Sequence, residues 1–204
     1  QQMRAIMKLA PLASALALTL ALTAPAQAGT SAMRQAQLSA ELFALGSEAG
    51  DPLLILAAAK LRKGISFNRD QSRGSGEGAG PLTWEEMLDE ARELAAGDEA
   101  VLGLIEDAAN ESSKGVATGQ VYSISTIRDG GTDTYDPLPF RAGEYAEVYV
   151  ESRDGSDLNL YVYDAKGRLV CSDTDISAIA YCGWRPEETG AFTIEVKNRG
   201  RGGA

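Results

Sequence analysis

Histidine is missing from all 204 residues of this sequence. Its absence excludes catalytic triads and dyads in which an imidazole is the base, and it excludes zinc, copper and iron sites that need a histidine ligand. No other catalytic motif is recognisable, so the sequence predicts a protein that is not an enzyme. The chemistry left open is hydrolysis by paired carboxylates, for which Glu147 and Glu151 are candidates.

Long apolar runs are also scarce, and the clearest lies near the amino terminus. Arg4 and Lys8 precede a short apolar stretch that ends in Ala-Gln-Ala at 26–28. A basic start, a short apolar run and an A-x-A ending predict a secretory signal peptide over residues 1–28. A membrane-spanning helix is less favoured, because it needs about 20 mainly apolar residues. We therefore expect a periplasmic or secreted mature chain that begins at Gly29 and has no integral membrane segment.

Basic residues are outnumbered, with 19 Lys and Arg against 29 Asp and Glu. The predicted signal peptide holds two of the basic residues and none of the acidic ones, which leaves 17 against 29 and a net charge of −12 in the mature chain. This excess disfavours nucleic acid and anionic lipid as partners, since both need a positive surface. A cationic partner or a metal ion is permitted.

Cysteine is nearly as scarce as histidine. Cys171 and Cys182 are the only two, and they stand eleven positions apart. A CxxC redox pair would need a closer spacing, and a cysteine nucleophile would lack its histidine partner. Because an exported chain meets an oxidising compartment, the pair predicts a structural disulfide.

The residues that are present divide the mature chain into two halves, and the first half, 29–114, reads as helical. A Gly-Asp pair recurs at 50–51 and 97–98, each time between a helix end and a new apolar helix. Thr83 and Glu86 have the spacing of a capping box. The recurrence predicts two helical hairpins that close into a small four-helix bundle. A solenoid of tetratricopeptide type is less favoured, because the repeat length does not match.

In the second half, 115–198, apolar residues alternate with polar ones, as in strands that bury one face. The stretch EYAEVYVESRDGSDLNLYVYD at 144–164 shows the alternation most clearly. Several short strands with regular turns predict an antiparallel β-sandwich, which residues 199–204 would follow as a disordered tail. The predicted fold class is therefore α+β, with the helical region first and the sandwich second.

Three segments of this half have a distinctive order of residues. They are F-x-A-G-E at 140–144, DGSDLNLYVYD at 154–164 and TGAFTIEV at 189–196. In this order the chain resembles the bacterial pre-peptidase C-terminal domain over roughly residues 117–198. The resemblance implies a sandwich of jelly-roll type, usually appended to secreted hydrolases, some of whose members bind calcium and polymeric substrates. Only helices precede the sandwich in this sequence, so the resemblance does not carry protease activity.

The central strands suggest a binding surface. A turn centred on Gly155 would form a hairpin in which Val150 faces Leu160. The outer face of that hairpin would gather Glu147, Tyr149, Glu151, Asn159, Tyr161 and Tyr163. We expect five of them to bind a polysaccharide or protein polymer: Tyr149, Tyr161, Tyr163, Glu147 and Asn159. The alternatives are that the residues form ordinary cross-strand pairs, or that the helical half covers the face and makes it an internal interface.

Aspartates concentrate in the turns of the same region, at Asp154, Asp157 and Asp164, with Asp173 and Asp175 further along. Calcium binds six to eight oxygen ligands, which such loops can supply. Aspartate is also a preferred turn residue, and the spacing of an EF-hand is absent. The sequence thus indicates no required cofactor. Calcium stays open as an ion that Asp154, Asp157 and Asp164 would bind.

Together these features predict an exported, non-catalytic binding or adaptor protein. Two other classes stay open: a hydrolase that uses carboxylates, and a structural subunit that docks a partner through its helical half. A deep pocket with converging carboxylates would favour the hydrolase, and a flat tyrosine face would favour binding.

Overall fold

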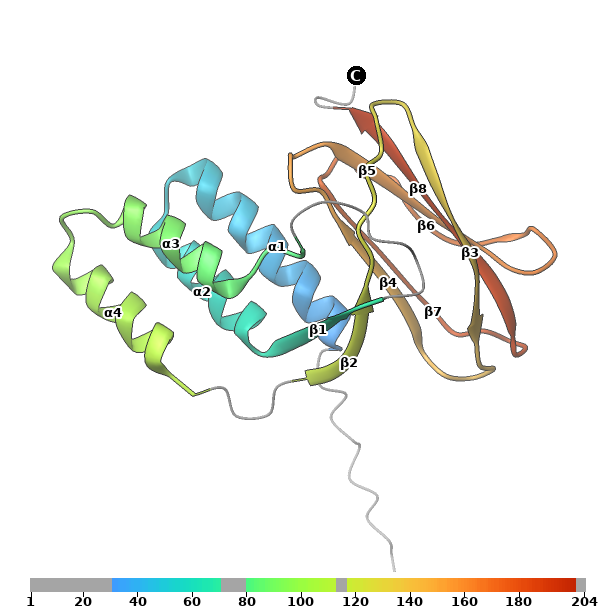
Figure 1. Cartoon of the computed structure of the whole chain (residues 1–204), viewed down its shortest axis with the longest axis horizontal. Helices are drawn as coiled ribbons and strands as arrows, with labels where there is room; N and C mark the ends of the chain where they lie inside the picture. The colour runs from blue at the N-terminus through green and yellow to red at the C-terminus, as the bar shows by residue number, and fades with distance from the viewer. Residues whose placement is uncertain (1–30, 71–79, 113–116, 201–204) are drawn as a thin grey trace, which may run out of the picture.

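The computed structural model describes residues 31–70, 80–112 and 117–200 (Figure 1). Its helices are α1 (Ala32–Ala49), α2 (Pro52–Lys63), α3 (Trp84–Leu94) and α4 (Glu99–Asn110). Its strands are β1 (Ile65–Arg69), β2 (Ala117–Tyr122), β3 (Thr132–Phe140), β4 (Ala146–Glu151), β5 (Asp157–Tyr163), β6 (Leu169–Asp173), β7 (Ile179–Trp184) and β8 (Gly190–Gly200). The fold class is mixed α+β, as predicted. The predicted signal peptide lies outside the described residues, as does the end of the predicted tail.

The helices begin at the capping residues that the sequence indicates. Asp51 accepts hydrogen bonds from the backbone N–H groups of Leu53 and Leu54 at the start of α2, and Asp98 caps α4 in the same way. Thr83 and Glu86 form the predicted capping box of α3. These side chains satisfy N–H groups that the first helical turn cannot pair.

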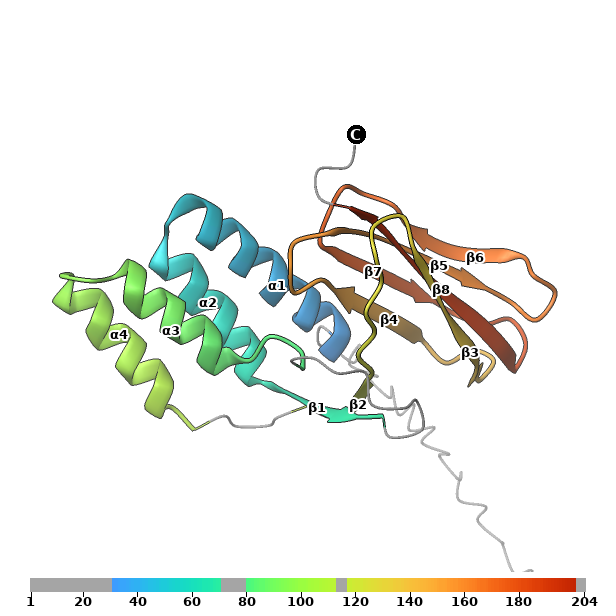
Figure 2. The ribbon, with the colours of Figure 1, turned by 45° about the horizontal axis from the view of Figure 1, so that its top comes forward.

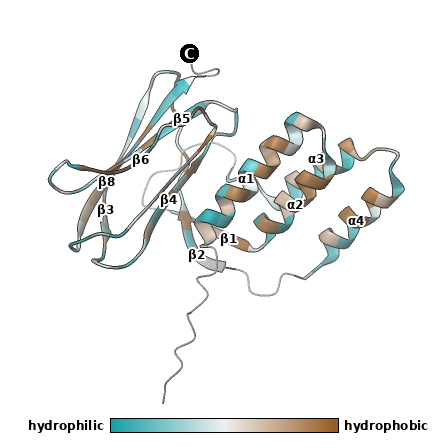
Figure 3. Cartoon of the chain, turned by 180° about the vertical axis from the view of Figure 1, so that it is seen from behind, coloured by the Kyte–Doolittle hydropathy of each residue, from teal (hydrophilic) through white to brown (hydrophobic). Residues whose placement is uncertain are grey.

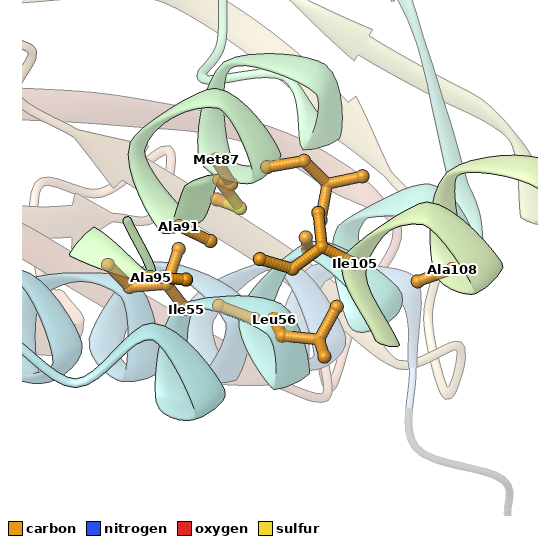
Figure 4. Close-up of a cluster of buried hydrophobic side chains, with 10 residues drawn as sticks. Ile55, Leu56, Met87, Ala91, Ala95, Ile105 and Ala108 are labelled. Carbon is orange, nitrogen blue, oxygen red and sulfur yellow. The ribbon is translucent and has the colours of Figure 1, made fainter. Parts of the chain in front are cut away.

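Buried residues of α2, α3 and α4 form one apolar cluster (Figure 4). Its members are Ile55, Leu56, Ala58, Ala59, Met87, Leu88, Ala91, Ala95, Ile105 and Ala108. α1 packs along α2, where Gly46 allows a close approach: a Cβ there would lie 2.7 Å from Ile55. A closed bundle would also place α1 beside α4, but α1 packs instead against β4 and β7 (Figure 2). The helices therefore form an open stack rather than the closed bundle expected.

Each helix alternates hydrophobic and hydrophilic patches (Figure 3). Among the helices that the structure describes, none is long and apolar enough to cross a membrane.

A short strand interrupts the region that was expected to be wholly helical. β1 follows α2 directly and pairs in parallel with β2, so that Phe67 lies beside Gln120 and Asn68 beside Val121. Five residues are too few to show a clear period, and the pairing partner lies about fifty positions along the chain. This strand therefore could not be predicted from the sequence pattern.

Two antiparallel sheets make up most of the second half. One has four strands in the order β3-β8-β5-β6, and the other has two, β4 and β7. Both contribute to one core of buried residues: Ala146, Leu158, Leu160, Val162, Ala180, Cys182, Trp184, Phe192, Ile194 and Val196. β8 continues to Gly200, two residues beyond the predicted end of the sheet.

The predicted hairpin between β4 and β5 was wrong. Val150 pairs with Ala180 of β7, whereas Leu160 pairs with Val196 of β8, so the two strands belong to different sheets. Gly155 does adopt the left-handed conformation of a tight turn, with φ of 78°. That turn carries the chain from one sheet to the other. Alternation indicates which side of a strand is buried, but it does not identify the strand beside it.

The predicted disulfide is confirmed. Cys171 of β6 and Cys182 of β7 are bonded, with their Cα atoms 5.9 Å apart, and the bond joins the two sheets across their shared core.

Replacing both cysteines with serine should lower the free energy of unfolding by about 2–4 kcal/mol, because the bond restricts the unfolded chain. Urea unfolding of the variant and the native protein measures the difference. Alkylation of the native protein without reductant should modify neither thiol. Full labelling under those conditions would contradict the bond.

Candidate functional site

The predicted ligand-binding residues lie on two different surfaces. Glu147 and Tyr149 are on β4, whereas Asn159, Tyr161 and Tyr163 are on β5 in the four-stranded sheet. The single face expected from the sequence does not exist, because the two strands do not pair. Each surface has its own environment and its own chemistry.

The helices cover the outer side of β4. Arg62 of α2 is only 2 % exposed, and its Nη2 lies 3.0 Å from Oε2 of Glu151. The same nitrogen donates to the hydroxyl oxygen of Tyr149 at 3.4 Å, and that hydroxyl in turn donates to Glu151. The backbone N–H of Leu82, just before α3, donates to Oε1 of Glu151 at 2.8 Å. One carboxylate thus receives hydrogen bonds from three separate segments.

Electrostatics holds this cluster in one protonation state. Burial acts to lower the pKa of Arg62, but the charge of Glu151 and the Tyr149 hydroxyl outweigh it, so the pKa is raised. Burial, and then the negative charge of Glu151, raise the pKa of Tyr149 well above its usual value. Arg62 stays a cation and Tyr149 stays neutral, as suits a structural contact.

The start of α1 covers the other end of β4. The hydroxyls of Ser31 and Tyr181 both donate to Oε1 of Glu147, the second at 2.5 Å. The guanidinium carbon of Arg34 lies 5.3 Å from the ring centre of Tyr181. Burial and the bond to Glu147 raise the pKa of Tyr181. Glu147 and Tyr149 therefore belong to an internal interface, which was one of the alternatives weighed from the sequence.

The carboxylates on β4 are poorly placed for paired catalysis. Glu147 and Glu151 lie four residues apart along one strand, which corresponds to about 13 Å. Glycoside hydrolases of the two-carboxylate kind need a separation of about 5–9.5 Å. Each carboxylate is also engaged by its own partners, so this face does not resemble a hydrolytic centre.

The outer face of the four-stranded sheet lies away from the helices (Figure 1, Figure 2). Tyr161 and Tyr163 project from it, with ring centres 6.4 Å apart and planes inclined by 16°. Lys197 of β8 places Nζ 4.9 Å from the ring centre of Tyr161 and forms an ion pair of 2.8 Å with Glu195. The hydrogen bond to Glu195, and then its charge, raise the pKa of Lys197.

Asn159 lies on the same face, next to Tyr161. It is buried, and its side-chain amide donates to the hydroxyl of Tyr161 at 3.3 Å. Direct contact between Asn159 and a ligand is therefore not supported, and its role is to position the tyrosine.

A hollow of about 440 Å³ opens beside Tyr163. Its lining residues come from β3, β5, β8 and the β5–β6 turn: Pro137, Tyr163, Asp164, Ala165, Gly167, Ala191 and Thr193. Of these residues, Tyr163 was predicted to bind the polymer and Asp164 was a candidate calcium ligand, whereas the other five were not predicted. Only their tertiary arrangement makes them a site.

The aspartates proposed as calcium ligands serve separate local contacts. Asp154 accepts from Ser152, and Asp157 accepts from the backbone of Ser177. Asp164 accepts hydrogen bonds from Lys166 and Arg168 in its own turn. Over residues 31–70, 80–112 and 117–200, no three acidic or cysteine side chains gather closely enough to hold a metal ion.

A scan against protein-family models and a search of the curated proteins find no match for this chain.

The ion pair of the buried Arg62 should contribute far more to the free energy of unfolding than an exposed ion pair does. Arg62→Met should lower the free energy of unfolding by about 3–5 kcal/mol, because it leaves the carboxylate of Glu151, whose side chain is only 13 % exposed, without its cation. Arg153→Met is the matched control. Arg153 also joins a strand region to a helix, at 2.7 Å from Glu86, but both side chains are more than a third exposed. Its removal should cost about 0–1 kcal/mol, and equal losses in urea unfolding would contradict this difference.

The exposed pair should give a small pH-dependent effect. The hydrogen bond from Arg153, above all, lowers the pKa of Glu86 from its usual 4.5. The ionised carboxylate therefore stabilises the fold above pH 4.5, and this contribution is lost as the pH falls below that value. Glu86→Gln keeps a residue suited to the capping box. It should be less stable than the native protein by up to about 1 kcal/mol at pH 7, with the gap closing near pH 3. A gap that stays constant in unfolding curves between pH 3 and 7 would contradict this assignment.

Proposed function

We propose that this chain is an exported, non-catalytic binding protein that recognises a polymer through the outer face of its four-stranded sheet. The observation that carries the proposal is the stacked pair of Tyr161 and Tyr163 on a sheet face that lies away from the helices. Tyrosine combines a large apolar ring with a polar hydroxyl, and such side chains are enriched where proteins bind. The stacked pair holds two such side chains in a fixed arrangement.

The fold that we propose for the second half is a sandwich of jelly-roll type, similar to the bacterial pre-peptidase C-terminal domain. The antiparallel sheets with a shared core support this proposal, together with the residue order that carries the resemblance. In this proposal the helical half acts as a rigid partner of the sandwich, since it occupies the outer face of β4 and leaves that of β5 for a ligand.

Export is part of the proposal. The signal-like character of residues 1–28 supports it, and the disulfide between Cys171 and Cys182 is compatible with an oxidising compartment.

Changing Tyr161 and Tyr163 to serine together should abolish retention on immobilised polysaccharides or protein polymers. Tyr161 and Tyr163 are half-buried, and contacts between side chains on a sheet face are individually weak, so the double variant should lose no more than about 2 kcal/mol of stability. Depletion of the full chain from suspensions of the polymers, with thermal unfolding alongside, measures both effects.

Tyr145→Ser is the matched control, because Tyr145 is 52 % exposed but lies beside the two-stranded sheet. It should bind as the native protein does. Unchanged retention of the double variant, or no retention of the native protein on any polymer, would refute the proposal.

A further inference from the structure

The side chains beside the hollow form a column with one open end. Lys197 lies over the ring of Tyr161, and Tyr161 stacks with Tyr163. The hollow is lined by Tyr163 but not by Tyr161, and its other walls come from the turn after β5 and from the neighbouring strands. The hollow therefore lies at the Tyr163 end of this column, and Lys197 lies at the other end.

The walls opposite this ring are small. Ala165, Gly167 and Ala191 contribute no more than a methyl group each, and Pro137 closes the side toward β3. Gly167 is in the left-handed region, with φ of 73°, which keeps the turn tight. A hollow of about 440 Å³ lies within the range of small-molecule sites, so it has room for a sugar-sized ring.

The charge within the lining of the hollow is already compensated. Asp164 is its only charged lining residue. Oδ1 of Asp164 accepts from the backbone N–H groups of Lys166 and Arg168, and Oδ2 accepts from Nε of Arg168 at 2.6 Å. Lys197, behind the tyrosines, is paired with Glu195. An ionised ligand would lose water here without gaining a free opposite charge from the lining residues, so the lining favours an uncharged one.

The neighbouring sheet edge is unsuited to binding a peptide as an added strand. β3 is an edge strand of the four-stranded sheet, and it contains Pro137 and Pro139, which have no N–H to donate. Recognition next to the hollow must therefore rely on ring contact rather than on a backbone ladder.

We infer that the hollow beside Tyr163 is a subsite for one uncharged sugar ring of a polysaccharide, which stacks on the open face of that tyrosine. This inference rests on the proposed polymer-binding function and names its ligand class. Tyr161 and Lys197 hold the stacking ring in place from behind, and Thr193 supplies a hydroxyl at the rim.

The test is to fill the hollow without touching the tyrosines. Ala191→Trp introduces a large ring at an exposed wall position. Ile176→Trp is the matched control, because Ile176 is 75 % exposed and lies between β6 and β7, outside the lining of the hollow. Both variants and the native full chain are tested against uncharged polysaccharides (cellulose, xylan, starch and β-1,3-glucan), acidic ones (alginate and polygalacturonate) and gelatin.

The native chain should bind at least one uncharged polysaccharide, and 0.5 M NaCl should not weaken that binding, because no ion pair forms. Ala191→Trp should weaken it at least tenfold with an unchanged melting temperature, and Ile176→Trp should leave it unaltered. Binding to gelatin or to acidic polysaccharides alone would overturn the inference and leave polymer binding standing. So would loss of binding in the double tyrosine variant but not in Ala191→Trp. Failure to bind every polymer would overturn both.

Discussion

The half-buried carboxylate of Glu151 is the group on which the arrangement of the two halves depends. It receives hydrogen bonds from α2, from the segment before α3 and from its own strand. A charge taken out of water is tolerated only when partners surround it, so all three segments must be in place together. The arrangement is not ideal for stability, because Nη1 of Arg62 is buried without a hydrogen-bond partner. Such a contact favours one specific docking of helices on sheet over others.

This docking divides the work between the two sheets. The helices cover the outer face of the two-stranded sheet, where its polar and aromatic residues contact Ser31, Arg34 and Arg62. The helices do not cover the outer face of the four-stranded sheet. The tyrosines on that face are held by contacts with residues of the same sheet. Residues that look alike in sequence, such as Tyr149 and Tyr161, therefore have opposite roles. The difference comes from the sheet to which each strand belongs.

Local signals predicted the local structure well. Asp51 and Thr83 marked helix starts, and the alternation in β4 and β5 indicated strands with the correct buried sides. The strand partners could not be predicted, since β4 pairs with β7 and β5 with β8 through contacts distant in sequence. Arg62 did leave a signal. It lies seven positions after Ile55, on the buried side of α2, where a cation needs a partner. The hollow left none, because its walls come from separate strands.

The candidate site depends on order that the tyrosines do not supply alone. A flexible aromatic side chain loses rotamer freedom when it binds, and that loss weakens affinity. Here the buried amide of Asn159 donates to the hydroxyl of Tyr161, while Lys197 lies against its ring. The turn that follows Tyr163 is held by Asp164, and the next strand, β6, is tied to the other sheet through Cys171. Both neighbours of the open ring are thus fixed before any ligand arrives. Such a face can bind one ring with little further loss of side-chain freedom. A polymer that binds through repeated weak contacts requires this, because each contact must be favourable on its own.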